Sequence, residues 1–141
     1  MNQKHIPNLE LCQEFDRLCK EKNITIPETE YFLGRHSGMD GTWSDYYLYS
    51  EKDNHCPDEQ IPAPLVSEQG EWLPQRIAKN KGQQVWALQC FKKMHNGKEE
   101  WFTRYENVEG TGFLNMQDPT EANARQKMLN YLITEGIITK L

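Results

Sequence analysis

The sequence predicts an α+β fold: an antiparallel sheet of four to five strands, with an N-terminal helix, a C-terminal helix and a short central helix packed mainly on one face. Three observations support this prediction. An amphipathic stripe starts near residue 9, an Asn-Gly turn joins two β-rich segments, and a capped helical segment fills the last quarter of the chain. Because 141 residues correspond to about one domain, we expect a single α+β domain over residues 1–141.

The first helix is expected over residues 9–22. Asn8 is a suitable N-cap residue, and Asn23 can adopt the left-handed conformation that ends a helix. One apolar face is predicted to consist of Leu11, Cys12, Phe15, Leu18 and Cys19. Two strands follow, at residues 28–35 and 43–50, and the short loop between them favours an antiparallel pair.

The middle of the chain gives weaker signals. Residues 51–63 are polar and are expected to be irregular, since Pro57, Pro62 and Pro64 exclude a long helix. A short helix is predicted over residues 67–72 or 74–79, because Gly70 and Pro74 interrupt anything longer.

The clearest hairpin joins residues 85–94 to residues 98–106 through Asn96 and Gly97, the pair that a type I′ turn prefers. A two-residue turn places Phe91 opposite Phe102 and Lys93 opposite Glu100. One face then holds Trp86, Leu88, Cys90, Trp101 and Tyr105, which are the core candidates. The other face holds Gln89, Lys93, Glu100, Arg104 and Glu106 around the Phe91–Phe102 pair.

After a short strand at residues 112–116, the last helix is expected over residues 122–135. Asp118 is expected to cap it, with Pro119 at its first position, and Gly136 to end it. The predicted inner stripe consists of Ala122, Arg125, Met128, Leu129, Leu132 and Ile133, with Ile137 folding back on Leu132.

The amino-acid composition argues against several classes of protein. The net charge of −5 argues against general nucleic-acid binding, and no apolar run has the length of a membrane span. The four cysteines, Cys12, Cys19, Cys56 and Cys90, show no paired spacing and suit reduced thiols in a cytoplasmic protein. No cofactor, metal site or catalytic motif is predicted, because His55 and Cys56 are the only close pair of metal-ligand types and no Gly-x-Ser-x-Gly or phosphate loop is present.

Three short sequence motifs resemble those of a known group of proteins. They are residues 8–12 followed by 29–32, residues 62–65 before the central helix, and residues 118–122 leading into 128–132. Together they resemble small bacteriophage and prophage proteins of gut bacteria, over nearly the whole chain. The resemblance implies a mobile-element and cytoplasmic context, and it implies no activity or catalytic residue.

The surplus of aromatic residues points to binding. One sheet face cannot bury them all, so we expect Phe91 and Phe102, flanked by Arg104 and Lys93, to form an exposed site for a protein partner, a small ligand or a second copy of the chain. The preferred hypothesis is a non-enzymatic phage-type accessory protein. Two alternatives stay open: a small enzyme with a site near His36, Asp40, Asp45 and His55, and an acidic inhibitor that imitates nucleic acid.

Overall fold

The computed structural model describes residues 5–50, 52–53, 57–78, 85–107, 109–110 and 112–141. In these residues three helices accompany two antiparallel sheets, which confirms the predicted α+β class. The helices are α1 (Leu9–Glu21), α2 (Val66–Trp72) and α3 (Glu121–Thr134). The strands are β1 (Tyr31–Arg35), β2 (Tyr47–Ser50), β3 (Glu59–Pro62), β4 (Arg76–Ala78), β5 (Val85–His95), β6 (Lys98–Asn107) and β7 (Phe113–Asp118).

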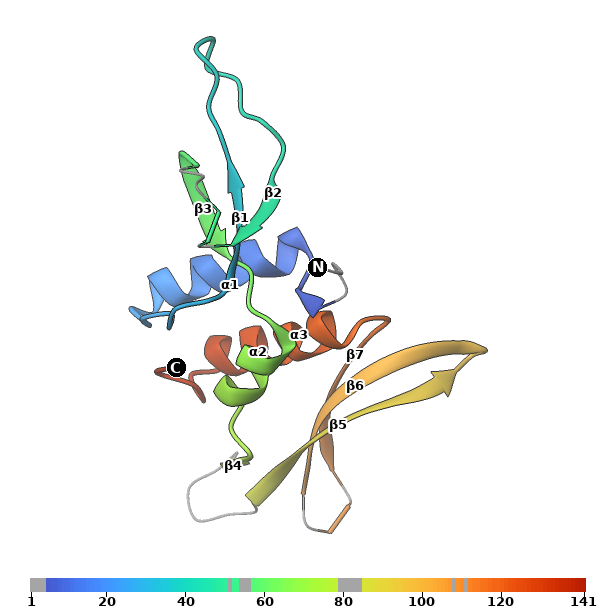
Figure 1. Cartoon of the computed structure of the whole chain (residues 1–141). Helices are drawn as coiled ribbons and strands as arrows, with labels where there is room; N and C mark the ends of the chain where they lie inside the picture. Colours follow the sequence, from blue (N-terminus) through green and yellow to red (C-terminus); the bar gives the residue numbers. More distant parts are fainter. Residues whose placement is uncertain (1–4, 51, 54–56, 79–84, 108, 111) are drawn as a thin grey trace.

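The strands are divided between two sheets rather than gathered in one. In the described part of the chain, β2-β1-β3 form the first sheet and β4-β5-β6-β7 form the second. The helices lie between them: α1 contacts β3 and α3, and α3 contacts β6 and β7 (Figure 1). The loop between β1 and β2 projects away from the helices (Figure 1).

Each sheet has its own apolar cluster. The larger cluster joins Phe15 of α1 and the inner face of α3 to Tyr105 of β6. The smaller cluster places Cys12 of α1 against Ile61 and Ala63, at the end of the first sheet. Helix α1 therefore contributes to both clusters, which explains why its buried residues include both cysteines.

The local signals for α1 are confirmed. The Asn8 side chain accepts a hydrogen bond from the Leu11 amide at 3.0 Å, and Asn23 has a φ of 55°. The buried residues of the helix are Cys12, Phe15, Leu18 and Cys19, four of the five predicted.

The N-cap predicted for α3 is wrong. Thr120, not Asp118, caps the helix, and its hydroxyl accepts from the Asn123 amide at 3.3 Å. Asp118 ends β7, and its carboxylate accepts from the Thr120 amide and from the Asn123 side chain, each at 3.0 Å. Asp118 therefore fixes the turn that precedes the cap. Gly136, with a φ of 72°, ends the helix as predicted.

The β5–β6 hairpin has the predicted register. Phe91 pairs with Phe102, Lys93 pairs with Glu100, and Asn96 and Gly97 have φ values of 50° and 76°, as a type I′ turn requires. Tyr105 is fully buried, and Trp86 and Leu88 pack on the larger cluster, so these three predicted core residues do face the core. The other two, Cys90 and Trp101, are half-buried.

Two short strands lie where the sequence predicted none. The segment expected to be irregular contains β3, which pairs with β1, and β4 pairs with β5 after the central helix. Of the two alternatives for that helix, the first is confirmed, since α2 spans Val66–Trp72.

A chain of buried amides links the three helices. Gln69 of α2 donates to the side chain of Gln126 at 3.0 Å, and Gln126 donates to the side chain of Asn130 at 2.9 Å. Asn130 in turn donates to the Leu11 carbonyl of α1 at 3.2 Å. Because buried amides are costly without partners, this chain favours one relative placement of the helices.

Candidate functional site

The predicted aromatic site lies on the outer face of β5 and β6. The rings of Phe91 and Phe102 stack with centroids 5.2 Å apart and planes 7° apart. The Lys93 ammonium lies 5.0 Å from the Phe102 ring, and the Arg104 guanidinium lies 5.2 Å from the Phe91 ring. The four predicted residues therefore do form one cluster.

The expected exposure of both rings is only half right. Phe102 is 3% exposed, Phe91 and Arg104 are half-buried, and Lys93 is exposed. Phe102 lies in β6 between β5 and β7, beside Gln117 of β7, and Phe91 stacks on it from β5. The cluster thus buries the Phe102 ring and leaves the Phe91 ring partly exposed.

The alternative His/Asp site does not assemble in the part of the chain that the structure describes, which excludes His55. The Nε2 atom of His36 lies 2.8 Å from the Tyr47 hydroxyl. Asp40 accepts from the Thr42 hydroxyl at 2.6 Å, and the hydrogen bonds from Thr42 lower the pKa of its carboxyl group. Asp45 lines a pocket of which His36 and Asp40 are not part.

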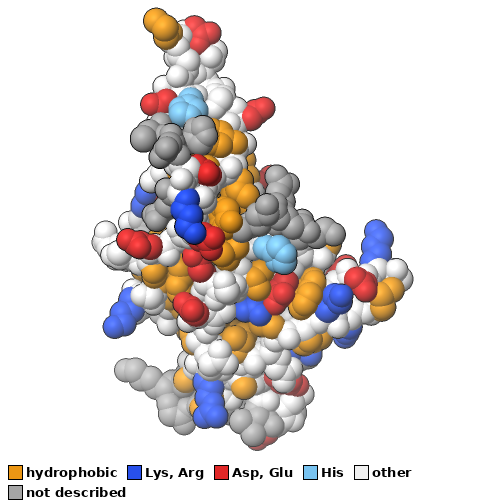
Figure 2. Space-filling model, viewed as in Figure 1, with side chains coloured by type: hydrophobic (Ala, Val, Ile, Leu, Met, Phe, Trp, Pro, Cys, Tyr) orange, Lys and Arg blue, Asp and Glu red, His pale blue; other side chains and the backbone are white. Residues whose placement is uncertain are grey.

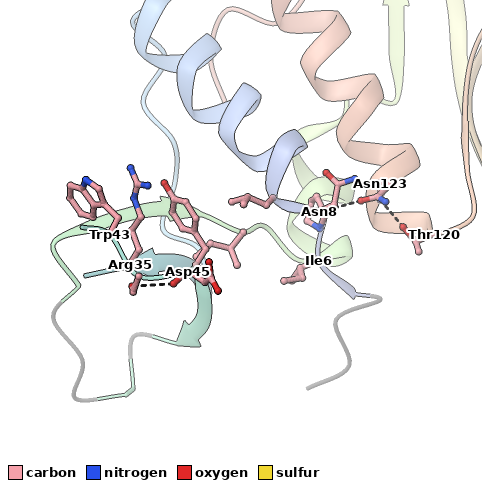
Figure 3. Close-up of a pocket in the computed structure, with 12 residues that line it drawn as sticks. Ile6, Asn8, Arg35, Trp43, Asp45, Thr120 and Asn123 are labelled. Carbon is pink, nitrogen blue, oxygen red and sulfur yellow. Dashed lines mark hydrogen bonds between the residues drawn. The ribbon is translucent and has the colours of Figure 1, made fainter. Parts of the chain in front are cut away.

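That pocket has a volume of about 780 Å³ and is called here the hairpin pocket. It lies between the N-terminal segment, the first sheet with its β1–β2 loop, and the start of α3 (Figure 3). Its apolar lining residues are Ile6, Pro7, Leu9, Leu33, Trp43 and Tyr46. Its polar lining residues are Asn8, Arg35, Ser44, Asp45, Thr120 and Asn123.

A cation–aromatic cluster forms one end of the hairpin pocket. The Arg35 guanidinium carbon lies 4.3 Å from the centroid of Trp43 and 4.9 Å from that of Tyr46. Glu59 of β3 accepts from Arg35 Nε at 2.7 Å and from the Tyr46 hydroxyl at 3.0 Å. The hydrogen bond from Arg35 is the main reason that the pKa of Glu59 lies below its usual value. At this end of the pocket, the charged and aromatic side chains are therefore held by contacts with one another.

Two helix caps form the opposite end. The Asn8 amide donates to the Asn123 side chain at 2.8 Å, and Thr120 accepts from the Asn123 amide (Figure 3). The residue that caps α1 is thereby attached to the first turn of α3. The pocket wall is thus fixed by the same hydrogen bonds that start the two helices.

Trp43 is the most accessible aromatic group of the pocket. It is 47% exposed, and it is the one exposed aromatic ring among the side chains that the structure describes. An antiparallel bridge between Trp43 and Ser37 closes the base of the loop, and the Ser44 amide donates to the His36 carbonyl at 2.8 Å. These bonds hold the ring at the pocket without burying it.

No metal or nucleophilic centre competes with this pocket in the described residues. They contain no group of three or more His, Cys, Asp and Glu side chains placed to hold a metal ion. Burial raises the pKa of the Cys12 thiol to about 12 and that of Cys19 to about 11, which keeps both thiols protonated and unreactive at neutral pH. Cys56 lies outside the described residues.

On the face that Figure 2 shows, the described acidic side chains do not form the continuous surface that nucleic-acid mimicry needs. In the described part of the chain, six Asp or Glu side chains are ion-paired with Lys or Arg. On the face in Figure 2, acidic side chains are scattered among basic and apolar ones.

None of the described helices has the length and apolar character needed to cross a membrane.

Comparisons of the chain with known proteins identify no relative. No family model matches the chain, and searches of curated proteins and of solved structures likewise give no match.

Sequence reasoning missed the hairpin pocket because its walls come from three distant segments. Asn8 was identified only as a helix cap, and Trp43 was assigned to a strand that in fact begins at Tyr47. The one available signal was the excess of aromatic residues, which includes Trp43 and Tyr46.

Proposed function

We propose that this protein is a non-enzymatic binding protein and that the hairpin pocket is its ligand site. The observation that carries the proposal is an accessible pocket of about 780 Å³ whose lining combines six apolar residues with six polar ones. Small-molecule sites have volumes of roughly 300–1,000 Å³ and this mixed character. The fixed caps at one end and the Glu59-bound Arg35 at the other favour a site that exists before the ligand arrives.

The biological context belongs to the same proposal. The resemblance to phage and prophage proteins supports an accessory role in the cytoplasm of an infected or lysogenic bacterium. The net charge of −5 and the absence of a basic cluster in the sequence favour a protein or small-molecule partner over nucleic acid.

The test is a fragment screen by NMR on the ¹⁵N-labelled protein. We expect at least one fragment class to shift the signals of Trp43 and of Leu9, on different walls of the pocket. Trp43→Ala should weaken that binding by about tenfold, since a half-exposed aromatic contact contributes on the order of 1–2 kcal/mol. Met39→Ala is the matched control, because Met39 is fully exposed on the same loop and does not line the pocket.

Fragments whose shifts map to other surfaces, or whose affinity is unchanged by Trp43→Ala, would refute the pocket as the site.

A second candidate surface is the outer face of β5 and β6. The observation that favours it is the partly exposed ring of Phe91, placed between Arg104 at 5.2 Å and Lys93 at 6.0 Å. It would bind a protein partner or a second copy of the chain. Phe91→Ala should then weaken capture of that partner or raise the fraction of monomer, and an unchanged result in both assays excludes this surface.

A further inference from the structure

The hairpin pocket contains one charge that has no partner among the described residues. Of the described residues, Arg35 and Asp45 are the two charged groups that line it. Arg35 is paired with Glu59, whereas the Asp45 carboxylate takes part in no hydrogen bond or ion pair with any described residue. Only the backbone carbonyl of Asp45 is engaged, as the acceptor for the Ser44 hydroxyl at 3.1 Å.

Arg35 is poorly placed to receive an anion. Its side chain is 28% exposed, two aromatic rings lie within 5 Å of its guanidinium carbon, and Glu59 neutralises its charge. An anionic ligand would have to compete with the Glu59 carboxylate, which the Tyr46 hydroxyl also holds in place. The charge that the pocket offers to a ligand is therefore negative.

The exposed tryptophan favours a ligand of the opposite charge. The face of an indole ring attracts cations, and Arg35 already lies over the Trp43 ring at 4.3 Å. Because 47% of Trp43 stays exposed, the ring can receive a second cationic group from solvent. The net charge of −5 adds a general attraction for cations.

Resting on the binding function proposed above, we infer that the ligand of the hairpin pocket is a small organic cation with an apolar body. The body packs on Ile6, Leu9 and Leu33, and the cationic group lies at Asp45 within reach of the Trp43 ring. The volume of about 780 Å³ suits a molecule of this class rather than a whole protein segment.

The experiment compares three probes that share a phenylethyl body: phenethylamine, 2-phenylethanol and 3-phenylpropionate. Their binding is measured by NMR titration of the full chain at neutral pH and low salt, with dissociation constants expected on the order of millimolar for molecules this small. We expect the order amine, alcohol, acid, with the amine about fivefold tighter than the alcohol, because an exposed ion pair and a cation–π contact each add a small favourable contribution in water. Added salt should reduce this preference.

Two variants locate the charge. Asp45→Asn should abolish the preference for the amine and leave the affinity for the alcohol unchanged. Glu28→Gln removes one exposed acid that lies outside the pocket, and it should leave the preference intact. If Asp45→Asn does not fold, the same question is decided by the wild-type titration, in which the amine should shift the Asp45 amide signal more than the alcohol does.

The outcomes separate the two proposals. Equal binding of the three probes, or tightest binding of the acid, overturns the cation assignment and leaves the pocket as a binding site. A salt-independent preference for the amine, or one that survives Asp45→Asn, also overturns it. Absence of shifts at the pocket with all three probes at about 10 mM overturns both the cation assignment and the pocket.

Discussion

Phe102 and Phe91 are adjacent rings on one face, and replacing each by Ala should have clearly different costs. Phe102 is 3% exposed, and Phe→Ala at a buried site costs about 3–5 kcal/mol. We expect a loss near the lower limit, about 3 kcal/mol, because Phe91 and the Lys93 stem can move into part of the space that is vacated. Phe91 is half-buried, so we expect about 1–1.5 kcal/mol for its replacement, including the lost stacking.

Urea denaturation followed by circular dichroism measures both values, provided that the slope of the transition is unchanged in the variants. At about 2–4 °C per kcal/mol for a chain of this size, Phe102→Ala should lower the Tm by roughly 6–12 °C. A loss below about 1 kcal/mol for Phe102→Ala would show that its ring is not packed. The aromatic pair would then be available for a partner, as the sequence suggested.

Three further predictions concern stability. Gln126→Ala breaks the buried amide chain and should lower the free energy of unfolding, measured by urea denaturation, by about 2–3 kcal/mol. The control Gln13→Ala, on the exposed side of α1, should lower it by less than about 0.5 kcal/mol. Equal losses for the two variants would contradict a stabilising role for the buried amides. Gly97→Ala places a side chain at a φ of 76° and should cost about 1 kcal/mol, so an unchanged transition midpoint would mean that the type I′ turn is absent. The pKa of Glu59 is lowered in the folded state, so its ionised carboxylate stabilises the fold above the unfolded pKa of about 4.5, and this stabilisation is lost as the pH falls through the folded pKa. Glu59→Gln should therefore flatten the acid limb of a plot of stability against pH. An acid limb as steep as in the wild type would argue against the Arg35–Glu59 interaction.

What the sequence predicted correctly depends on neighbours along the chain. The Asn8 cap, the Asn96–Gly97 turn and the end of α3 at Gly136 each rest on the backbone preference of one or two residues. Once the turn was assigned, the pairing of β5 with β6 followed, because register is fixed by turn length. The locations of α1 and α3 followed from these end signals together with the spacing of their apolar residues.

What the sequence did not predict depends on distant partners. Strand β3 has four residues and β4 has three, and each contains a proline or a charged residue that lowers its strand propensity. They are strands because β1 and β5 offer edges to pair with. The division into two sheets has the same origin, since no local pattern states which hairpin pairs with which.

The hairpin pocket shows how local chemistry can prepare a site that local reasoning does not identify. The Asn8 side chain caps α1, and the Asn8 amide, which α1 leaves outside its own hydrogen bonds, is satisfied by the Asn123 side chain in α3. One residue thereby joins two helix starts through a hydrogen bond between residues that are 115 positions apart in sequence. Because the first sheet packs on α1 through Cys12 and Ile61, the same junction positions the β1–β2 side of the pocket. Loss of the Asn8–Asn123 bond should therefore alter ligand binding at Trp43 without any direct contact between them, which links the architecture of this fold to its proposed function.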